Sequence, residues 1–310
     1  MFANGFKIAG MLTAATAVGL AATTAQAQLS GSILIDGSST VFPITEAMAE
    51  EFRGENPSID ISVGVSGTGG GFSKFCNGET VINNASRGVK DSEREACATN
   101  GIEFTEIQVG IDAITVVVSS ETEIFGATGE VESLSFDQLA QIWGPSSERR
   151  VRRWRQVDRG WSNRLITLFG PGTDSGTFDF FTDEVNGEEG ASRADYIASE
   201  DDNVLVLGVS RSEYALGYFG LAYYLENQDV LKAVPVEGIE PNFETAASGE
   251  YPLSRPLFIY VNNEALERPE VAAFVEFYLE TARDTDLVTE VGYVAMLDDL
   301  YTNILADLGL

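Results

Sequence analysis

The sequence predicts an α/β fold that is divided into two lobes. Short apolar runs that suit strands alternate with amphipathic stretches that suit helices along most of the chain. Three of the apolar runs end in turns rich in glycine and hydroxyl side chains, and a helical pattern follows each turn. The length of 310 residues exceeds what one hydrophobic core usually organises, so we expect two lobes.

The first strand–turn–helix unit spans residues 29–52. Residues 29–36 form an apolar run of strand type, and the turn that follows contains Ser39 and Thr40. Pro43 suits the first turn of a helix, where its missing amide costs no hydrogen bond. We therefore expect a helix N-terminus directly behind these two hydroxyl groups.

The second unit repeats this arrangement. Residues 57–65 alternate between apolar and polar side chains, as in a half-buried strand, and they lead into a glycine-rich turn with Ser66 and Thr68. A short strand over 81–83 then leads to a loop that contains Arg87.

The third unit has the clearest anion-binding pattern. A strand-like run over 165–169 is followed by a turn with Ser175, Gly176 and Thr177, and a helical pattern begins at Phe178. The first amides of a helix have no partner within it, and the helix dipole favours negative charge there. Such turns lie at the carboxyl edge of an α/β sheet, where ligands bind. The alternative is a capped helix that binds nothing.

The remaining elements follow from the same patterns. We expect strands over 102–109, 114–119 and 256–261, helices over 133–143, 269–278 and 297–308, a helix near residue 91 with Ser92 and Glu95 as its capping box, and an apolar core segment over 216–224. The apolar stretch 203–210 is expected to end at the cap of a helix that begins near Ser210.

The charge of the chain limits its partners. The formal net charge is −29, which disfavours binding to nucleic acids and to anionic membranes. An anion site in this chain must therefore work through local, buried hydrogen bonds. Seven of the 19 basic residues nevertheless gather in one short segment, and these are Arg149, Arg150, Arg152, Arg153, Arg155, Arg159 and Arg164. We interpret this segment as a solvated loop or as a docking patch for a partner.

The N-terminus and the cysteines indicate export. Residues 1–27 combine Lys7, an apolar run and a small-residue cleavage pattern that ends at Ala27, as in a secretory signal peptide. In an exported protein, Cys76 and Cys97 are expected to form a disulfide. The sequence contains no histidine, which argues against a metal site and against Ser-His-Asp catalysis. A phosphatase that uses Ser175 as its nucleophile remains the enzymatic alternative.

The three turns, taken in order, resemble those of the phosphate-binding proteins that serve the high-affinity phosphate ABC transporter of bacteria. The resemblance runs from Asp36-Gly37-Ser38-Ser39-Thr40 through Leu216-Gly217-Tyr218-Phe219 to the last helices. It implies a periplasmic-binding-protein fold in which each lobe is a mostly parallel sheet flanked by helices, with a two-crossover hinge. Lobe 1 would comprise residues 28–112 and 253–310, and lobe 2 residues 113–252.

The same resemblance implies a function and a set of ligand-binding residues. The protein would be a periplasmic monomer that captures phosphate without a cofactor or catalysis and delivers it to permease subunits. Its ligand-binding residues would be Ser39, Thr40, Val41, Thr68 or Ser66, Ser175, Gly176 and Thr177. The alternative ligand is another oxyanion, such as sulfate, molybdate or a phosphonate.

The chain departs from the family pattern at two positions. Pro171 stands where many members have an arginine, and Arg87 stands in the segment where the same members have an aspartate. We expect Arg87 to supply the missing cation as a bidentate ligand of phosphate. Asp174 or Asp112 would then accept the proton of the bound phosphate.

Overall fold

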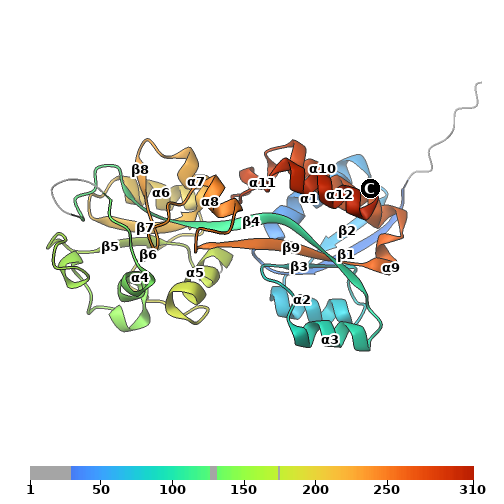
Figure 1. Cartoon of the computed structure of the whole chain (residues 1–310), viewed down its shortest axis with the longest axis horizontal. Helices are drawn as coiled ribbons and strands as arrows, with labels where there is room; N and C mark the ends of the chain where they lie inside the picture. The colour runs from blue at the N-terminus through green and yellow to red at the C-terminus, as the bar shows by residue number, and fades with distance from the viewer. Residues whose placement is uncertain (1–28, 126–130, 174) are drawn as a thin grey trace, which may run out of the picture.

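Two β-sheets share one long strand. The computed structural model describes residues 29–125, 131–173 and 175–310. Strand β4 (Phe104–Ser119) pairs with strands of both sheets, and β9 (Ser254–Asn262) runs antiparallel beside its first part. Figure 1 shows two lobes with β4 and β9 running between them.

The first lobe contains the start and the end of the described chain. Its sheet has the strand order β2-β1-β3-β9-β4, and β1 pairs in parallel with both β2 and β3. The other elements of this lobe are β1 (Gly31–Gly37), α1 (Phe42–Glu55), β2 (Ile59–Val63), α2 (Gly67–Cys76), β3 (Ile82–Ala85), α3 (Asp91–Thr99), α9 (Asn263–Leu266), α10 (Pro269–Asp284), α11 (Leu287–Glu290) and α12 (Asp298–Leu308).

The second lobe is built from the middle of the chain. Its sheet has the order β4-β7-β5-β6, with β8 on the other side of β4, and β5 pairs in parallel with β6 and β7. Its elements are α4 (Phe136–Trp143), the short 3₁₀ helices η1 (Pro145–Ser147) and η2 (Trp154–Gln156), β5 (Thr167–Gly170), α5 (Gly176–Asn186), β6 (Ile197–Ala198), α6 (Asp202–Ser210), β7 (Ala215–Gly220), α7 (Leu221–Glu226), β8 (Leu231–Val234) and α8 (Phe243–Ala247).

The two lobes pack around different side chains. The core of the first lobe is mainly aliphatic and includes Ile33, Val109 and Val275, whereas the core of the second lobe is richer in aromatic rings. There the rings of Phe181 and Tyr218 stack with their centroids 3.7 Å apart. The structure confirms the predicted α/β fold class.

Cys76 and Cys97 form the expected disulfide, which joins α2 to α3. This bond lies in a small buried cluster with Phe72, Phe75 and Tyr260. No helix among the described residues is long and apolar enough to cross a membrane. The expected signal peptide, residues 1–27, lies outside the described part of the chain.

Three local predictions need correction. The expected strands 102–109 and 114–119 are one strand, β4, because a bulge between Gln108 and Gly110 lets the chain continue from one sheet into the other. The stretch 203–210 is itself helix α6, capped by Asp201, whose side chain accepts a hydrogen bond from Asn203 N at 2.9 Å. In α3 the side chain that caps the start belongs to Glu93, which accepts from Lys90 N at 2.9 Å.

Candidate functional site

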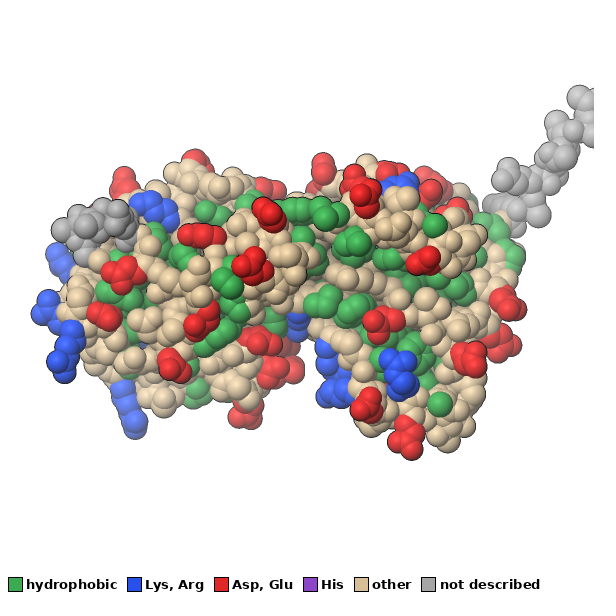
Figure 2. All heavy atoms as spheres, in the orientation of Figure 1, with side chains coloured by type: hydrophobic (Ala, Val, Ile, Leu, Met, Phe, Trp, Pro, Cys, Tyr) green, Lys and Arg blue, Asp and Glu red, His purple; other side chains and the backbone are tan. Residues whose placement is uncertain are grey.

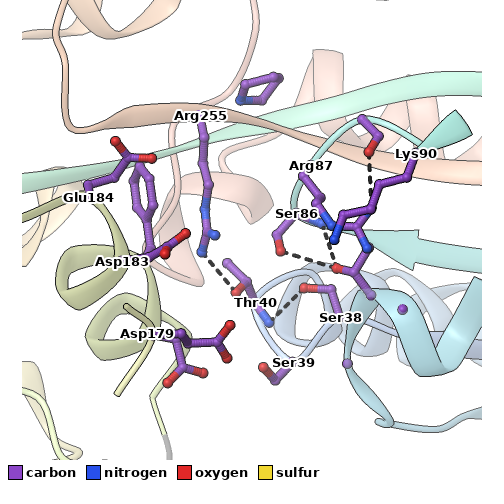
Figure 3. A pocket seen from close by; sticks show the side chains of 17 residues that line it. Ser38, Ser39, Thr40, Ser86, Arg87, Lys90, Asp179, Asp183, Glu184 and Arg255 are labelled. Atoms are coloured by element: carbon purple, nitrogen blue, oxygen red, sulfur yellow. Dashed lines mark hydrogen bonds between the residues drawn. The ribbon is translucent and has the colours of Figure 1, made fainter. Parts of the chain in front are cut away.

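A cleft of about 740 Å³ is lined by the first two predicted turns and by the helix that follows the third turn. The first lobe contributes Ser38 to Thr40, Gly67 to Gly69 and the loop from Ser86 to Lys90, and the second lobe contributes α5. Arg255 and Pro256 of β9 complete the lining between the lobes. Figure 3 shows side chains of both lobes directed into this space.

Close packing at Gly37 and hydrogen bonds to Ser38 fix the backbone of the first turn. Strand β1 ends at Gly37, whose φ of +138° favours glycine, and an added Cβ there would lie 2.2 Å from Asn84 O. Ser38 then accepts a hydrogen bond from Thr40 N at its Oγ (3.2 Å) and from Phe42 N at its carbonyl oxygen (3.1 Å). As a result, Ser39 and Thr40 line the cleft at the N-terminus of α1.

In the second turn, the two alternative residues have different partners. Ser66 donates its hydroxyl to Asp36, which also accepts a hydrogen bond from Lys74 Nζ at 2.6 Å. Thr68 lines the cleft instead, and its Oγ1 accepts from Ser86 N at 3.2 Å. Of the two predicted alternatives, the structure therefore brings Thr68 to the cleft.

Arg87 also reaches the cleft, but it already has a partner. Its guanidinium forms two hydrogen bonds to Glu93, at 2.9 Å from Nη1 and 2.8 Å from Nη2. Burial raises the pKa of Glu93, but the hydrogen bond from Arg87 helps to leave it below its usual value. Arg87 is therefore a cleft-facing cation whose charge is largely balanced by an acid of its own lobe.

A second arginine, which the sequence did not single out, lies between the lobes. Arg255 Nη2 is 3.0 Å from Asp112 Oδ2 and donates hydrogen bonds to Thr40 Oγ1 (3.1 Å) and Gly176 O (3.2 Å). Its guanidinium carbon also stands 4.0 Å from the centre of the Phe180 ring. Arg255 thus contacts both lobes and presents a fixed cation to the cleft.

Asp112 serves as the partner of that arginine. Its side chain is only 3% exposed, and it lies opposite Arg255 in the register of β4 and β9. Burial raises the pKa of Asp112, and the guanidinium beside it opposes that rise. Asp112, which we expected to accept a ligand proton, is therefore paired with Arg255 and does not line the cleft.

The third turn lies next to Arg255. Ser175 caps α5, since its Oγ accepts from Thr177 N at 3.2 Å. Gly176 approaches the first lobe so closely that an added Cβ would lie 2.3 Å from Thr40 Oγ1. The third turn therefore touches the first turn, but Ser175, Gly176 and Thr177 are not among the described residues that line the cleft, and Val41 is buried. Asp174 lies outside the described residues.

Comparisons with known proteins place this geometry in a family. The model of a PBP superfamily domain matches residues 22–281. The chain belongs to the PBP superfamily. It is 45% identical over 276 residues to Protein SphX of Synechococcus elongatus, and the match covers 87% of this chain and 79% of that protein. It is also 36% identical over 278 residues to the phosphate-binding protein PstS of Staphylococcus saprophyticus, covering 88% of this chain and 82% of that protein.

Solved structures of the PBP superfamily agree with the fold. A possible phosphate binding protein from Planctomyces limnophilus superposes with a TM-score of 0.83 at 44% identity, covering 91% of this chain and 98% of that one. An ABC-type phosphate transport receptor from Vibrio cholerae has a TM-score of 0.67 at 22% identity, over 85% and 99% of the two chains. The second likeness supports the fold alone.

In this PBP-superfamily chain, the two walls of the cleft carry opposite charge. Helix α5 presents Asp179, Asp183 and Glu184 to the cleft, facing the side that holds Arg87 and Lys90 (Figure 3). Burial and the nearby charge of Glu189 raise the pKa of Asp179, while Arg255 opposes the rise. These acids were not predicted as site residues, because in the sequence they are typical of the solvated face of an amphipathic helix.

Proposed function

We propose that this protein captures inorganic phosphate in the cleft between its lobes and delivers it to the permease of an ABC transporter. It would do so as a monomer in the periplasm, after removal of the signal peptide, and without catalysing a reaction. The names of the PstS relative and of the Planctomyces limnophilus structure support phosphate as the ligand. The transport role rests on the resemblance of the three turns to phosphate-binding proteins of ABC transporters.

The position of Arg255 is the observation that carries the proposal. A phosphate dianion needs a fixed positive charge when it leaves water, because burial of an unpaired charge is costly. Arg255 provides one at the junction of the lobes, beside the helix starts that carry Thr40 and Gly176. The overall charge of −29 repels anions, so this local contact must supply the attraction.

The other ligand contacts come from hydroxyl groups and amides of the three turns. We assign them to Ser39, Thr40, Val41, Thr68, Ser175, Gly176 and Thr177, with Arg87 as a second cation at the cleft wall. Because these groups belong to both lobes, a bound phosphate would favour closure of the cleft. The rigid units in that motion would be residues 28–112 with 253–310, and residues 113–252.

We assign recognition of the phosphate proton to Asp179. Asp112 is paired with Arg255, whereas Asp179 faces the cleft and lies within the electrostatic reach of Arg255. A carboxylate beside a bound anion is tolerated when a proton lies between them. Hydrogen phosphate can supply that proton, and sulfate cannot at neutral pH. Asp179 would therefore discriminate between these two anions.

Calorimetric titration of the purified, ligand-free protein tests the proposal. We expect phosphate to bind with one site per chain and far more tightly than sulfate, molybdate or methylphosphonate. Tighter binding of one of those anions, or no binding of phosphate, would overturn it. Incubation with p-nitrophenyl phosphate tests the enzymatic alternative at Ser175, and we expect no release of nitrophenol.

A further inference from the structure

The arginine-rich segment forms a surface at the end of the second lobe. Seven arginines between Arg149 and Arg164 make up this arginine surface, and all seven side chains are exposed. They surround η2, at the end of the lobe opposite the crossing strands β4 and β9, where Figure 2 shows several basic side chains projecting into solvent. The cleft residues lie elsewhere, so the proposed phosphate site does not use this surface.

These arginines have few partners within the described chain. Only Arg149 has a described carboxylate within 4.0 Å, Glu148 Oε1 at 3.6 Å. Arg153 donates to the carbonyl oxygen of Asn163 at 2.6 Å, and Arg164 lies 5.5 Å from the centre of the Tyr214 ring. The segment from Arg149 to Arg164 contains one acid, Asp158, against seven arginines, which is an unusual concentration of positive charge in a chain with 48 acidic residues. Since neighbouring like charges repel, the cluster does little to stabilise the fold.

The backbone beneath the arginine surface is fixed. Trp154 and Trp161 are buried, and their indole nitrogens donate to Tyr214 O (3.0 Å) and Glu132 Oε2 (3.1 Å). Gln156 Oε1 accepts hydrogen bonds from Arg152 N at 2.8 Å and from Arg153 N at 2.9 Å. The guanidinium groups therefore project from a rigid frame, which reduces the entropy lost when they bind a partner.

We propose that the arginine surface docks against an acidic surface of a protein partner, namely the permease that the proposed function requires. Guanidinium groups suit carboxylates because they form two parallel hydrogen bonds to one carboxylate. An anionic lipid surface fits less well, because an extended negative plane would also repel the acidic body of the protein. Trp154 and Trp161 are both buried, so neither offers the exposed indole ring typical of membrane interfaces.

The test measures binding of the purified protein to the transporter's membrane subunits in nanodiscs of neutral lipid. Arg152→Glu/Arg155→Glu removes two guanidiniums for which the described chain shows no side-chain partner. The matched control, Arg94→Glu/Arg211→Glu, makes the same charge change at exposed positions elsewhere. Vesicles of phosphatidylglycerol and phosphatidylcholine without protein serve as the lipid probe. Calorimetry with phosphate, run on each variant, tests the proposed function separately.

We expect the wild type to bind the nanodiscs in a salt-sensitive manner, and the Arg152→Glu/Arg155→Glu variant to bind about tenfold more weakly. The control should bind the nanodiscs as the wild type does, and both variants should bind phosphate normally. Equal binding by the two variants would overturn the proposal, as would failure of the wild type to bind. Binding to phosphatidylglycerol vesicles as tight as that to the nanodiscs would assign the surface to lipid and overturn it too.

Discussion

Arg255 and the buried Asp112 form an ion pair across β9 and β4, with Arg255 Nη2 standing 3.0 Å from Asp112 Oδ2. The pair lies on the two strands that run between the lobes, and the same guanidinium contacts Thr40 of one lobe and Gly176 of the other. The cation proposed to bind phosphate is therefore also a connection between the lobes.

Replacement of Arg255 should damage both binding and stability. We expect Arg255→Ala to weaken phosphate binding at least about a hundredfold, because the ligand loses a charged contact in a partly desolvated site. It should also lower the free energy of unfolding by about 3 kcal/mol, since Asp112 is left buried and unpaired. Calorimetry and urea unfolding measure the two effects.

A double variant separates these two roles of Arg255. Asp112→Asn/Arg255→Ala removes the unpaired charge, so it should recover much of the lost stability while phosphate binding stays weak. Arg87→Ala should weaken binding less than Arg255→Ala does, because Arg87 lies on one wall of the cleft, whereas Arg255 contacts both lobes. If Arg87→Ala loses more phosphate affinity than Arg255→Ala does, Arg87 is the principal cation of the binding site.

Asp179→Asn should reduce the discrimination between phosphate and sulfate. The amide can donate a hydrogen bond to either anion, so we expect the ratio of the two affinities at neutral pH to fall by about tenfold or more. Titration with both anions measures that ratio. Asp183→Asn is the matched control because it lies one helical turn away and also lines the cleft. The assignment to Asp179 is wrong if both variants keep the wild-type ratio.

Of the residues predicted from the sequence, Ser39, Thr40, Thr68 and Arg87 line the cleft, whereas Arg255 and the acids of α5 were not predicted. Each predicted turn stands at the start of a helix, because a strand end followed by glycine and hydroxyl residues is a local signal, although among the described residues of these turns only Ser175 caps its helix with a side chain. Arg255 has no such signal, since its partner Asp112 is 143 residues away in the chain. One clue was available: both residues are charged and lie in the two segments where the crossovers were expected.

The errors in element boundaries have a similar origin. Residues 110–113 were left between two expected strands, but tertiary contacts keep them within β4. The bulge after Gln108 accommodates Gly110, and Arg255 neutralises Asp112. In α6 the local signal was present and was misinterpreted, because Asp201 precedes the apolar run and caps it.

Asp202 should make stability depend on pH. Burial, with Asp201 and Glu200 nearby, raises the pKa of Asp202 from 3.8 to about 6. The folded state therefore holds this proton more tightly than the unfolded state does. The associated stability is present below pH 3.8 and is lost as the pH rises to about 6. We expect a loss of about 2 kcal/mol in the free energy of unfolding over this window.

Urea unfolding at several pH values checks this expectation, with Asp202→Asn as the comparison. The amide cannot titrate, so the variant should become more stable relative to the wild type as the pH rises across the window. Parallel curves for the two proteins would show that Asp202 does not titrate differently in the folded and unfolded states.

Loss of the disulfide should reduce stability and leave phosphate binding intact. The bond closes a loop with a sequence separation of 21, which is worth about 3 kcal/mol by restriction of the unfolded chain. Cys76 ends α2, whereas Thr68 lies at the start of that helix, so the cleft keeps its contacts. Thermal unfolding of Cys76→Ser/Cys97→Ser and its titration with phosphate should show these separate effects. A large loss of affinity in the folded variant would contradict this separation.

Gly176→Ala should weaken phosphate binding without unfolding the protein. An added Cβ would lie 2.3 Å from Thr40 Oγ1 and 3.1 Å from Thr40 Cα, so the start of α5 would have to move away from the first turn. That movement would also lengthen the hydrogen bond from Arg255 to Gly176 O. We expect an affinity loss of about tenfold, since one charge-assisted contact and the local donor geometry are disturbed.

Gly54→Ala provides the control for Gly176→Ala. Gly54 lies within α1, and nothing stands within 4 Å of an added Cβ there. Alanine should therefore stabilise that helix by up to about 1 kcal/mol and leave phosphate binding unchanged. If Gly176→Ala binds phosphate as tightly as Gly54→Ala does, the close contact between the third turn and Thr40 is not part of the binding site.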